Sequence, residues 1–208
     1  MKLFVLGGTG NVGRLVVEQA LEAGHQVTVV GRDPQRLGSL AGRVEFAQGD
    51  ATDPATLDRM QGSQAVISTL SAGPSGAPDT MTRAMIGTVE AMRRYGIKRI
   101  VILTNTSAAA PGDRPTAIQR IIKSILELRL GRINDDHRAQ ARVLLESDLD
   151  WTIVRAPRLV DRPMSGRVRV GNLDGSAHIS VGRADLAACI LRWAVEGEHV
   201  REMPLVSG

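Results

Sequence analysis

Short runs of β-branched and aliphatic residues alternate, in the first half of the chain, with segments whose apolar residues recur every three or four positions. The runs predict strands and the spaced segments predict helices. Strands are predicted at residues 2–6, 26–30, 44–47, 65–69 and 99–104, and helices at 11–23, 34–40, 54–60 and 79–95, with a Gly/Pro loop at 73–78. Strands that alternate with helices in this way are typical of a parallel sheet covered on both faces.

The second half of the chain is less regular. Helices are predicted at residues 115–130, 135–147 and 183–195, and strands at 151–155, 167–170, 178–180 and 203–206. No repeat, low-complexity tract or linker separates the two halves. We therefore expect an α/β protein with a Rossmann-type doubly wound parallel sheet. Residues 1–208 would form a single domain, with a small C-terminal lobe that covers the substrate.

A glycine-rich loop, GGTGNVG at residues 7–13, follows the first predicted strand and opens the first predicted helix. Gly7 would permit a tight turn, Gly10 would let a pyrophosphate approach the backbone, and Gly13 would let the helix pack closely on the strand. The free N–H groups of the helix N-terminus would bind the phosphates. A plain turn is the alternative, but the position between strand and helix indicates a dinucleotide-binding loop.

The residues after the second predicted strand bear on the choice of cofactor. Proteins that bind NAD usually have an acidic residue there, which accepts from the ribose 2′-hydroxyl. Here Arg32 follows Gly31, and Arg36 lies one turn further on. Guanidinium groups pair with a 2′-phosphate, so NADP(H) is favoured over NAD(H). In the alternative, Arg32 is a solvated charge and Asp33 caps a helix that starts at Pro34.

Composition narrows the classes of function. The chain has a formal charge of +4 and 2% aromatic residues. Its arginines are scattered and few aromatic rings could stack on bases, so nucleic-acid binding is not favoured, whereas an anionic cofactor or substrate fits the charge. The single cysteine, Cys189, fits a reducing compartment. With no apolar run long enough for a membrane span and no signal peptide, a cytoplasmic protein is predicted.

Several catalytic signatures are absent from the chain. Typical short-chain dehydrogenases use a tyrosine with a lysine four residues later, but the only tyrosine here is Tyr95, and Lys98 has the wrong spacing. No set of histidines and carboxylates has metal-ligand spacing, and no metal site is predicted. Asp135 and Asp136, just before His137, are interpreted as helix caps. Reduction of a flavin or quinone needs no tyrosine, because solvent can protonate the product.

Five stretches together resemble the atypical short-chain dehydrogenases, and among them the NAD(P)H-binding group that includes flavin reductase (biliverdin-IXβ reductase) and NmrA-like proteins. They are GGTGNVG at 7–13, VTVVGRDPQRL at 27–37, GDATD at 49–53, NDDHRAQARVLLESDLDWTIVRAPRLVDRP at 134–163 and ISVGRADLAACILR at 179–192. The resemblance implies that the pyrophosphate is held by Gly7, Thr9, Gly10, Asn11 and Val12, and the 2′-phosphate by Arg32, Gln35 and Arg36. It also implies that the adenine lies by Asp50 and Ala51, the adjoining ribose by Leu70 and Ser71, and the nicotinamide by Pro157. Asp50 could instead cap a turn.

The chain departs from the flavin reductase pattern near the expected substrate. That family has a Thr-Ser pair after the fifth strand. Here the sequence is TNTS at 104–107, so either Asn105 or, after a two-residue shift, Ser107 takes the serine position. Arg158 replaces a histidine that follows the nicotinamide proline, and it could pair with an anionic acceptor. The segment from Ser107 to Asn134 is longer than in the family. Asn105, Ser107 and Arg158 are the candidate catalytic residues.

Two hypotheses of function follow. The first is an NADPH-dependent reductase that transfers hydride to a flavin, a quinone or a similar planar small molecule. The second is a non-enzymatic NADP(H) sensor of the NmrA type, which acts through a protein partner. The missing tyrosine and the altered serine and histidine positions motivate the second hypothesis.

Overall fold

One mixed sheet forms the centre of this computed structural model, which describes residues 1–71 and 77–208, apart from the side chains of residues 122, 123 and 125–130. Its eight strands lie in the order β3-β2-β1-β4-β5-β6-β10-β8. Their bounds are β1 Lys2–Leu6, β2 Gln26–Gly31, β3 Glu45–Gln48, β4 Ala65–Ser68, β5 Arg99–Asn105, β6 Asp150–Ala156, β8 Arg169–Gly171 and β10 Leu205–Ser207. Neighbouring strands are parallel except β8, which pairs with β10 in the antiparallel direction. The predicted Rossmann-type sheet is confirmed.

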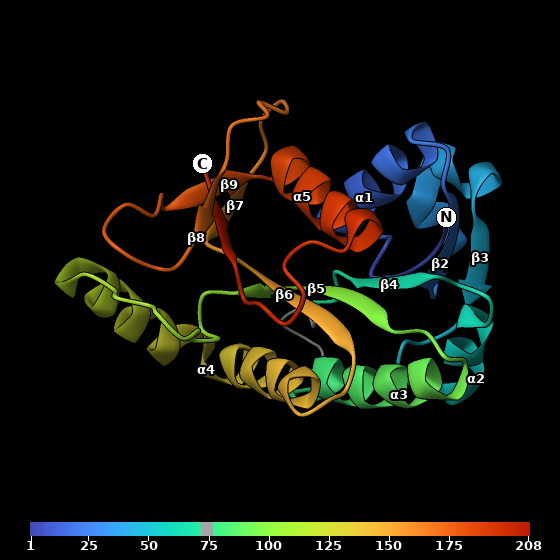
Figure 1. Ribbon diagram of the computed structural model, residues 1–208, viewed down its shortest axis with the longest axis horizontal. Coiled ribbons are helices and arrows are strands. Elements are labelled where there is room, and N and C mark those ends of the chain that lie inside the picture. The colour runs from blue at the N-terminus through green and yellow to red at the C-terminus, as the bar shows by residue number, and fades with distance from the viewer. Residues whose placement is uncertain (72–76) are drawn as a thin grey trace.

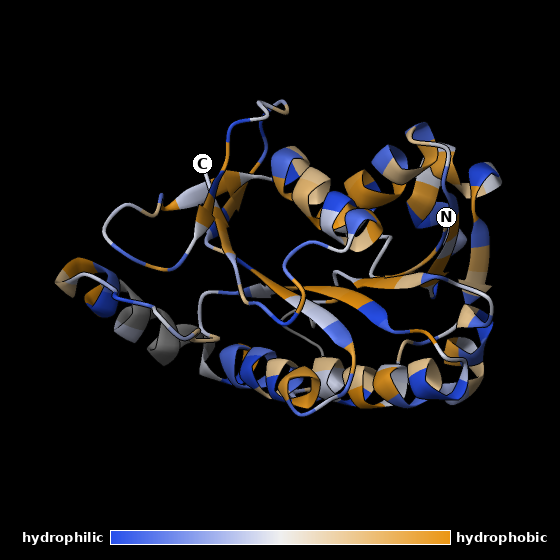
Figure 2. Cartoon of the chain, viewed as in Figure 1, coloured by the Kyte–Doolittle hydropathy of each residue, from blue (hydrophilic) through white to orange (hydrophobic). Residues whose placement is uncertain are grey.

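Helices cover both faces of this sheet (Figure 1). On one face α1 (Asn11–Glu22) packs against α5 (Arg183–Glu196), and on the other α3 (Thr80–Arg94) packs against α4 (Ala117–Leu145). Shorter pieces complete the connections: η1 (Pro34–Arg43) after β2, and α2 (Pro54–Leu57) with η2 (Asp58–Met60) after β3. Figure 2 shows hydrophobic residues along the strands and mixed colours on the helices, as a two-sided core requires.

The residues of β1 show how the sequence produces this double core. Leu3 and Val5 are buried in the cluster under α1 and α5, whereas Phe4 and Leu6 are buried in the cluster under α3 and α4. Successive side chains of a strand point to opposite faces, so a strand buried on both faces reads as a continuous apolar run. The order of the strands reverses between β1 and β4, and in open parallel sheets ligands bind beyond the carboxyl ends of the strands at this point.

The two helices predicted at 115–130 and 135–147 are in fact one helix, α4, of 29 residues. It begins with a capping box in which Thr116 and Gln119 each satisfy the other's backbone N–H group. The expected break was at Gly131 and the polar residues after it. A helix tolerates an interior glycine at a cost of about 1 kcal/mol. The polar side chains of Asn134 and Asp136 find partners on other elements, so they do not end the helix.

The remaining differences are local. The helix predicted at 34–40 is the 3₁₀ segment η1, which continues to Arg43 through a kink at Gly38. Strand β7 (Arg158–Val160) was not predicted, and β9 (Ser180–Gly182) begins at the last residue of the predicted strand 178–180. These two strands pair in parallel as a small second sheet. With β8 they form the expected C-terminal lobe. The Gly/Pro loop predicted at 73–78 lies mostly outside the described residues.

Candidate nucleotide-binding site

The glycine loop is pressed against the end of β4. Gly7 has φ +78°, and a Cβ there would lie 2.7 Å from the backbone carbon of Thr69. A Cβ at Gly13 would lie 2.1 Å from the carbonyl oxygen of Gly7. The fold itself therefore requires glycine at these two positions. Gly10 differs, because its nearest neighbour would be the Gly7 oxygen at 3.3 Å. Protein contacts therefore restrict Gly10 less than they restrict Gly7 and Gly13.

The N-terminus of α1 carries no capping side chain among the described residues. Gly10 is the N-cap residue, and the first turn contains no acidic residue. The N–H groups of residues 11–13 precede the first helical hydrogen bond, which Arg14 donates to the carbonyl of Gly10 at 2.9 Å. A helix start of this kind has an effective positive charge of about half an elementary charge and free donors. It is suited to hold a phosphate group beside Thr9, Asn11 and Val12.

The end of β2 adjoins this loop. A Cβ at Gly31 would lie 3.1 Å from the methyl carbon of Thr9, so the loop and the residues after β2 share one edge. Asp33 caps η1 by accepting from the Gln35 N–H at 2.9 Å, as the alternative interpretation of Asp33 predicted. Arg32 and Arg36 are exposed, and neither has an ion pair with any residue that the structure describes.

Asp50 acts as a turn cap. Its Oδ1 accepts from the backbone N–H of Thr52 at 2.9 Å and from the Thr52 hydroxyl at 2.8 Å. These hydrogen bonds, with a smaller effect of Arg32, lower the pKa of Asp50. A contact of Asp50 with adenine stays a prediction. Ala51 and Leu70 pack on the core cluster beneath α3, and Ser71 is exposed after β4.

The candidate catalytic residues Asn105 and Ser107 lie in one hydrogen-bonded turn after β5. Asn105 Nδ2 donates to the side-chain oxygen of Asn134 at 3.0 Å, and its Oδ1 accepts from the Ser107 N–H at 2.9 Å. The Ser107 hydroxyl is buried and donates to the Asn134 carbonyl at 3.5 Å. Both side chains therefore already help to fix the turn. Either residue can take the position of the family serine.

Pro157 and Arg158 come to the same edge of the sheet from β6. Ala156 is the register partner of Asn105, so Pro157 lies one residue beyond that pair. Arg158 opens β7, where its N–H donates to the Ile179 carbonyl at 3.3 Å. Its side chain is exposed and makes no ion pair within the described part of the chain. Among these residues, no hydrogen bond or ion pair joins it to Asn105 or Ser107.

Two interactions of α4 were not foreseen. Asp136 does cap a helix, but not its own: its two carboxylate oxygens accept from the N–H groups of Met81 and Thr82 at the start of α3, each at 2.9 Å. One residue later, His137 Nδ1 lies 3.1 Å from the buried Thr104 hydroxyl. Burial lowers the pKa of His137, and Asp136 partly opposes this shift. The NDDH stretch was visible in the sequence, but the partners of His137 and Asp136 lie 33 and 55 residues away.

A buried ion pair anchors the loop after β5. Arg155 is fully buried and holds Asp113 with two hydrogen bonds, of 2.6 and 2.9 Å. Asp113 also accepts from the N–H groups of Ala110 and Leu173. Burial alone would raise the pKa of Asp113, but the hydrogen bonds from Arg155 and these two N–H groups lower it. The pair therefore fixes the loop to the C-terminal lobe.

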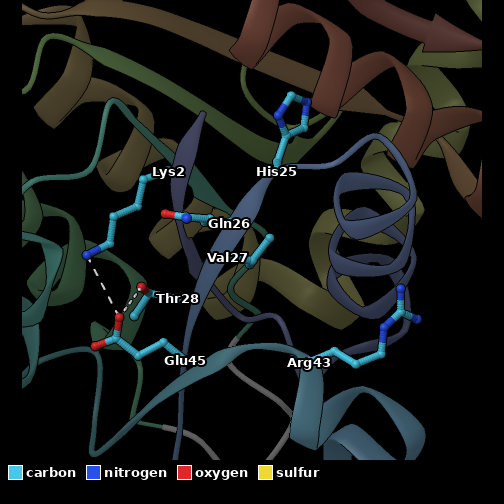
Figure 3. A pocket seen from close by; sticks show the side chains of 7 residues that line it. All are labelled: Lys2, His25, Gln26, Val27, Thr28, Arg43 and Glu45. Atoms are coloured by element: carbon cyan, nitrogen blue, oxygen red, sulfur yellow. Dashed lines mark hydrogen bonds and ion pairs between the residues drawn. The ribbon is translucent and has the colours of Figure 1, made fainter.

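A hollow of about 310 Å³ lies at the amino ends of the strands, away from the glycine loop. Figure 3 shows Lys2, His25 and Glu45 among the side chains that line it. Glu45 is 3.8 Å from Lys2 Nζ and also accepts from the Thr28 hydroxyl. None of the predicted site residues lines this hollow, so it is separate from the nucleotide site.

The described residues contain no group of three or more histidines, cysteines, aspartates or glutamates placed to hold a metal ion. Nor do they include a helix that is both long and apolar enough to cross a membrane.

Several known proteins have similar sequences or structures. A UPF0659 protein of Schizosaccharomyces pombe is 28% identical over 96% of this chain and 87% of its own length. The 2-alkyl-3-oxoalkanoate reductase of Stenotrophomonas maltophilia is 31% identical over 90% of this chain but only 63% of its own length. The solved structure of an anaerobillin reductase from Escherichia coli O157:H7 has a TM-score of 0.82 at 22% identity and covers 100% of this chain and 97% of that one.

The family described as NAD(P)H-binding matches residues 7–196, which include the glycine loop, the turn after β2 and the DDH segment of α4. The expected nicotinamide cofactor is thus confirmed as NAD(P)H. This chain belongs to the NAD(P)H-binding family of oxidoreductases.

Proposed function

We propose that this protein is an NADPH-dependent reductase that transfers hydride to a flavin, a quinone or a similar planar acceptor. The observation that carries the proposal is the uncapped start of α1 beside Arg32 and Arg36, which form no ion pair in the described part of the chain. The first feature suits a pyrophosphate, and the second suits a 2′-phosphate better than a hydroxyl. Two of the similar proteins are named reductases, and their names specify different substrates.

The proposed cofactor contacts combine the open start of α1 with the contacts that the family resemblance implies. The N–H groups of residues 11–13 would bind the pyrophosphate, with Gly10 giving it room to approach. Arg32, Gln35 and Arg36 would hold the 2′-phosphate. The adenine end would lie by Asp50 and Ala51, the adjoining ribose by Leu70 and Ser71, and the nicotinamide by Pro157. When bound, the cofactor supplies the hydride.

The acceptor would bind where β5 and β6 end. The Asn105 amide and the Ser107 hydroxyl can orient it by hydrogen bonds, but neither is a strong acid. Solvent would therefore protonate the reduced product. Arg158, exposed and without an ion pair among the described residues, would contribute positive charge toward an anionic acceptor. The lobe of β7, β8 and β9 would cover the acceptor.

The test is NADPH oxidation with FMN and with a neutral quinone. Oxidation with either acceptor supports the reductase. NADPH binding without oxidation by either one contradicts it and favours the second candidate, an NADP(H) sensor of the NmrA type with a protein partner. One observation favours that candidate: both polar ends of the Asn105 amide already hold the turn after β5.

Arg158→Ala tests the place of the acceptor. The loss of one charge-assisted hydrogen bond should lower kcat/KM for FMN about tenfold and leave the value for a neutral quinone almost unchanged. Arg167→Ala, another exposed arginine of the lobe, is the control and should affect neither acceptor. Equal losses for FMN and quinone in Arg158→Ala would show that the acceptor lies elsewhere.

The proposal also covers location and domain structure. We propose that residues 1–208 form one domain, which is supported by the pairing of β10 with β6 in the central sheet. A cytoplasmic location is supported by Cys189, which is a buried free thiol. NADPH chemistry fits this reducing compartment.

A further inference from the structure

A third arginine reaches the turn that carries Arg32 and Arg36. Arg14 belongs to the first part of α1 and follows the last glycine of the glycine loop directly. Its Nη1 donates to the carbonyl oxygen of Arg36 at 2.8 Å. This hydrogen bond ties the start of α1 to η1, although the two residues are 22 positions apart in the chain.

The kink in η1, at Gly38, lies next to the Arg14 guanidinium. Gly38 has φ 56° and ψ −126°, a conformation that side-chain-bearing residues rarely adopt. A Cβ at Gly38 would lie 3.6 Å from Nη1 and 3.7 Å from Nη2 of Arg14. The Arg14 guanidinium therefore lies between the carbonyl of Arg36 and the bend at Gly38, and it supports the shape of the whole turn.

The positive charge in this region is not neutralised by ion pairs within the described ranges. There, Arg14, Arg32 and Arg36 take part in none. The neighbouring carboxylates of Asp33 and Asp50 each accept a hydrogen bond from a backbone N–H group, and neither forms an ion pair with these arginines. The turn thus carries two arginines, and the guanidinium of a third is hydrogen-bonded to its backbone. Such a cluster is stable in water but gains most from an anion with several acceptor oxygens.

We propose that Arg14 determines the preference for NADPH, as a third basic residue beside the ribose 2′-phosphate. One N–H of its guanidinium holds the Arg36 carbonyl, and the remaining N–H groups are available to the phosphate. Arg14 therefore acts both by charge and by holding the turn that presents Arg32 and Arg36. The inference rests on the proposed use of NADPH and adds a residue from α1 to that site.

The test compares Arg14→Ala with the unchanged protein in titrations with NADPH and NADH. The Kd for NADPH should rise about tenfold, as for the loss of one charge-assisted contact, while the Kd for NADH changes less than about twofold. Adenosine 2′,5′-bisphosphate and 5′-AMP should repeat this difference as competitors. Arg43→Ala is the matched control, because Arg43 is an exposed arginine at the far end of η1 and has no ion pair in the described ranges. It should leave both Kd values unchanged.

Equal losses for NADPH and NADH in Arg14→Ala would overturn the inference, because a merely structural role acts on both cofactors. If the alanine variant does not fold, Arg14→Lys and Arg14→Gln replace it. Lysine keeps the charge and should retain most of the NADPH preference, whereas glutamine should lose it. The same preference in both variants would also overturn the inference. If the unchanged protein binds NADH with the same affinity as NADPH, the proposed cofactor is refuted instead.

Discussion

The start of α1 and the start of α3 are satisfied differently in the same fold. Both helices follow strands of the central sheet, and neither has a side-chain cap from its own N-cap residue. At α3, the Asp136 carboxylate from α4 accepts from two of the free N–H groups. At α1, no acidic residue lies in the first turn, and glycines surround it. The protein supplies its own anion at one helix start and leaves the other open.

Under the proposed function, the difference separates a structural helix start from one that binds a ligand. Both have the same dipole and the same unpaired donors, so neither property alone identifies a ligand site. The proposed site at α1 rests on its neighbours: Gly10, which protein contacts restrict less than Gly7 or Gly13, and Arg32, which has no ion pair among the described residues. Because the two helix starts are far apart in the chain, each can be changed separately.

The largest effect is expected when the cap of α3 is removed. Asp136→Ala leaves two backbone N–H groups without their acceptor and removes the shorter hydrogen bond of the Thr82 hydroxyl, and it should lower the free energy of unfolding by about 3 kcal/mol. Denaturant unfolding measures this change. Asp135→Ala is the control: Asp135 is exposed, pairs with Arg138 at the surface, and should cost less than about 1 kcal/mol. Similar losses in the two variants would contradict the assigned cap.

The next largest effect concerns the open helix start. Gly10→Val should weaken NADPH binding by about a hundredfold, because a branched side chain there blocks the approach of the pyrophosphate, which forfeits about 2.7 kcal/mol. The variant should remain folded, since Gly10 has only one close neighbour in the described structure. Gly13→Ala is the counterpart and should lose stability, because its Cβ would overlap the Gly7 oxygen. Unchanged NADPH affinity in Gly10→Val would show that the loop does not hold the cofactor.

A charge reversal at the end of β2 tests whether the proposed cofactor site extends from the start of α1 to Arg32. Arg32→Glu should reduce the preference for NADPH over NADH about tenfold or more, because an attraction to the 2′-phosphate becomes a repulsion. Fluorescence titration with both cofactors measures it. If the two affinities fall by the same factor, Arg32 does not contact the 2′-phosphate.

The smallest effect is expected when α1 is made to resemble α3. Asn11→Asp places a carboxylate in the first turn of α1, where it should stabilise the helix by about 0.5 kcal/mol and compete with a phosphate. NADPH affinity should fall about fivefold, and NADH affinity by the same factor, because both share the pyrophosphate. Asn11→Ser serves as the uncharged control. Tighter NADPH binding in the aspartate variant would contradict the role of this helix start.

The sequence predicted the features whose signals are local. The central strands and the glycine loop depend on adjacent residues, and the family match confirmed the cofactor class. The capping of α3 was missed because Asp136 lies 55 residues from Met81. Strand β7 has three residues, too few for a period of two to be seen. The polar run at 134–137 predicted a helix break because its partners on other elements were not visible.

The choice of candidate site residues was limited in the same way, because contacts between distant residues are not visible in the sequence. Arg32 could be singled out because it occupies a position where NAD-binding proteins carry an acid. Arg14 could not, because only the folded turn brings it to Arg36. Likewise, spacing left Asn105 and Ser107 as alternatives, whereas the structure joins them in one turn through a direct hydrogen bond.

The buried pair of Arg155 and Asp113 has a consequence for the order in which the chain is assembled. Arg155 also donates to the carbonyl oxygens of Ala108 and Met203, at 3.3 and 2.8 Å. Its partners thus come from before and after it in synthesis, and the guanidinium cannot be fully satisfied until residue 203 has left the ribosome. The glycine loop and the first four strands emerge much earlier. A nascent chain would therefore make the glycine loop early, but it would secure the loop after β5, like the packing of α5 on α1, only near the end of translation.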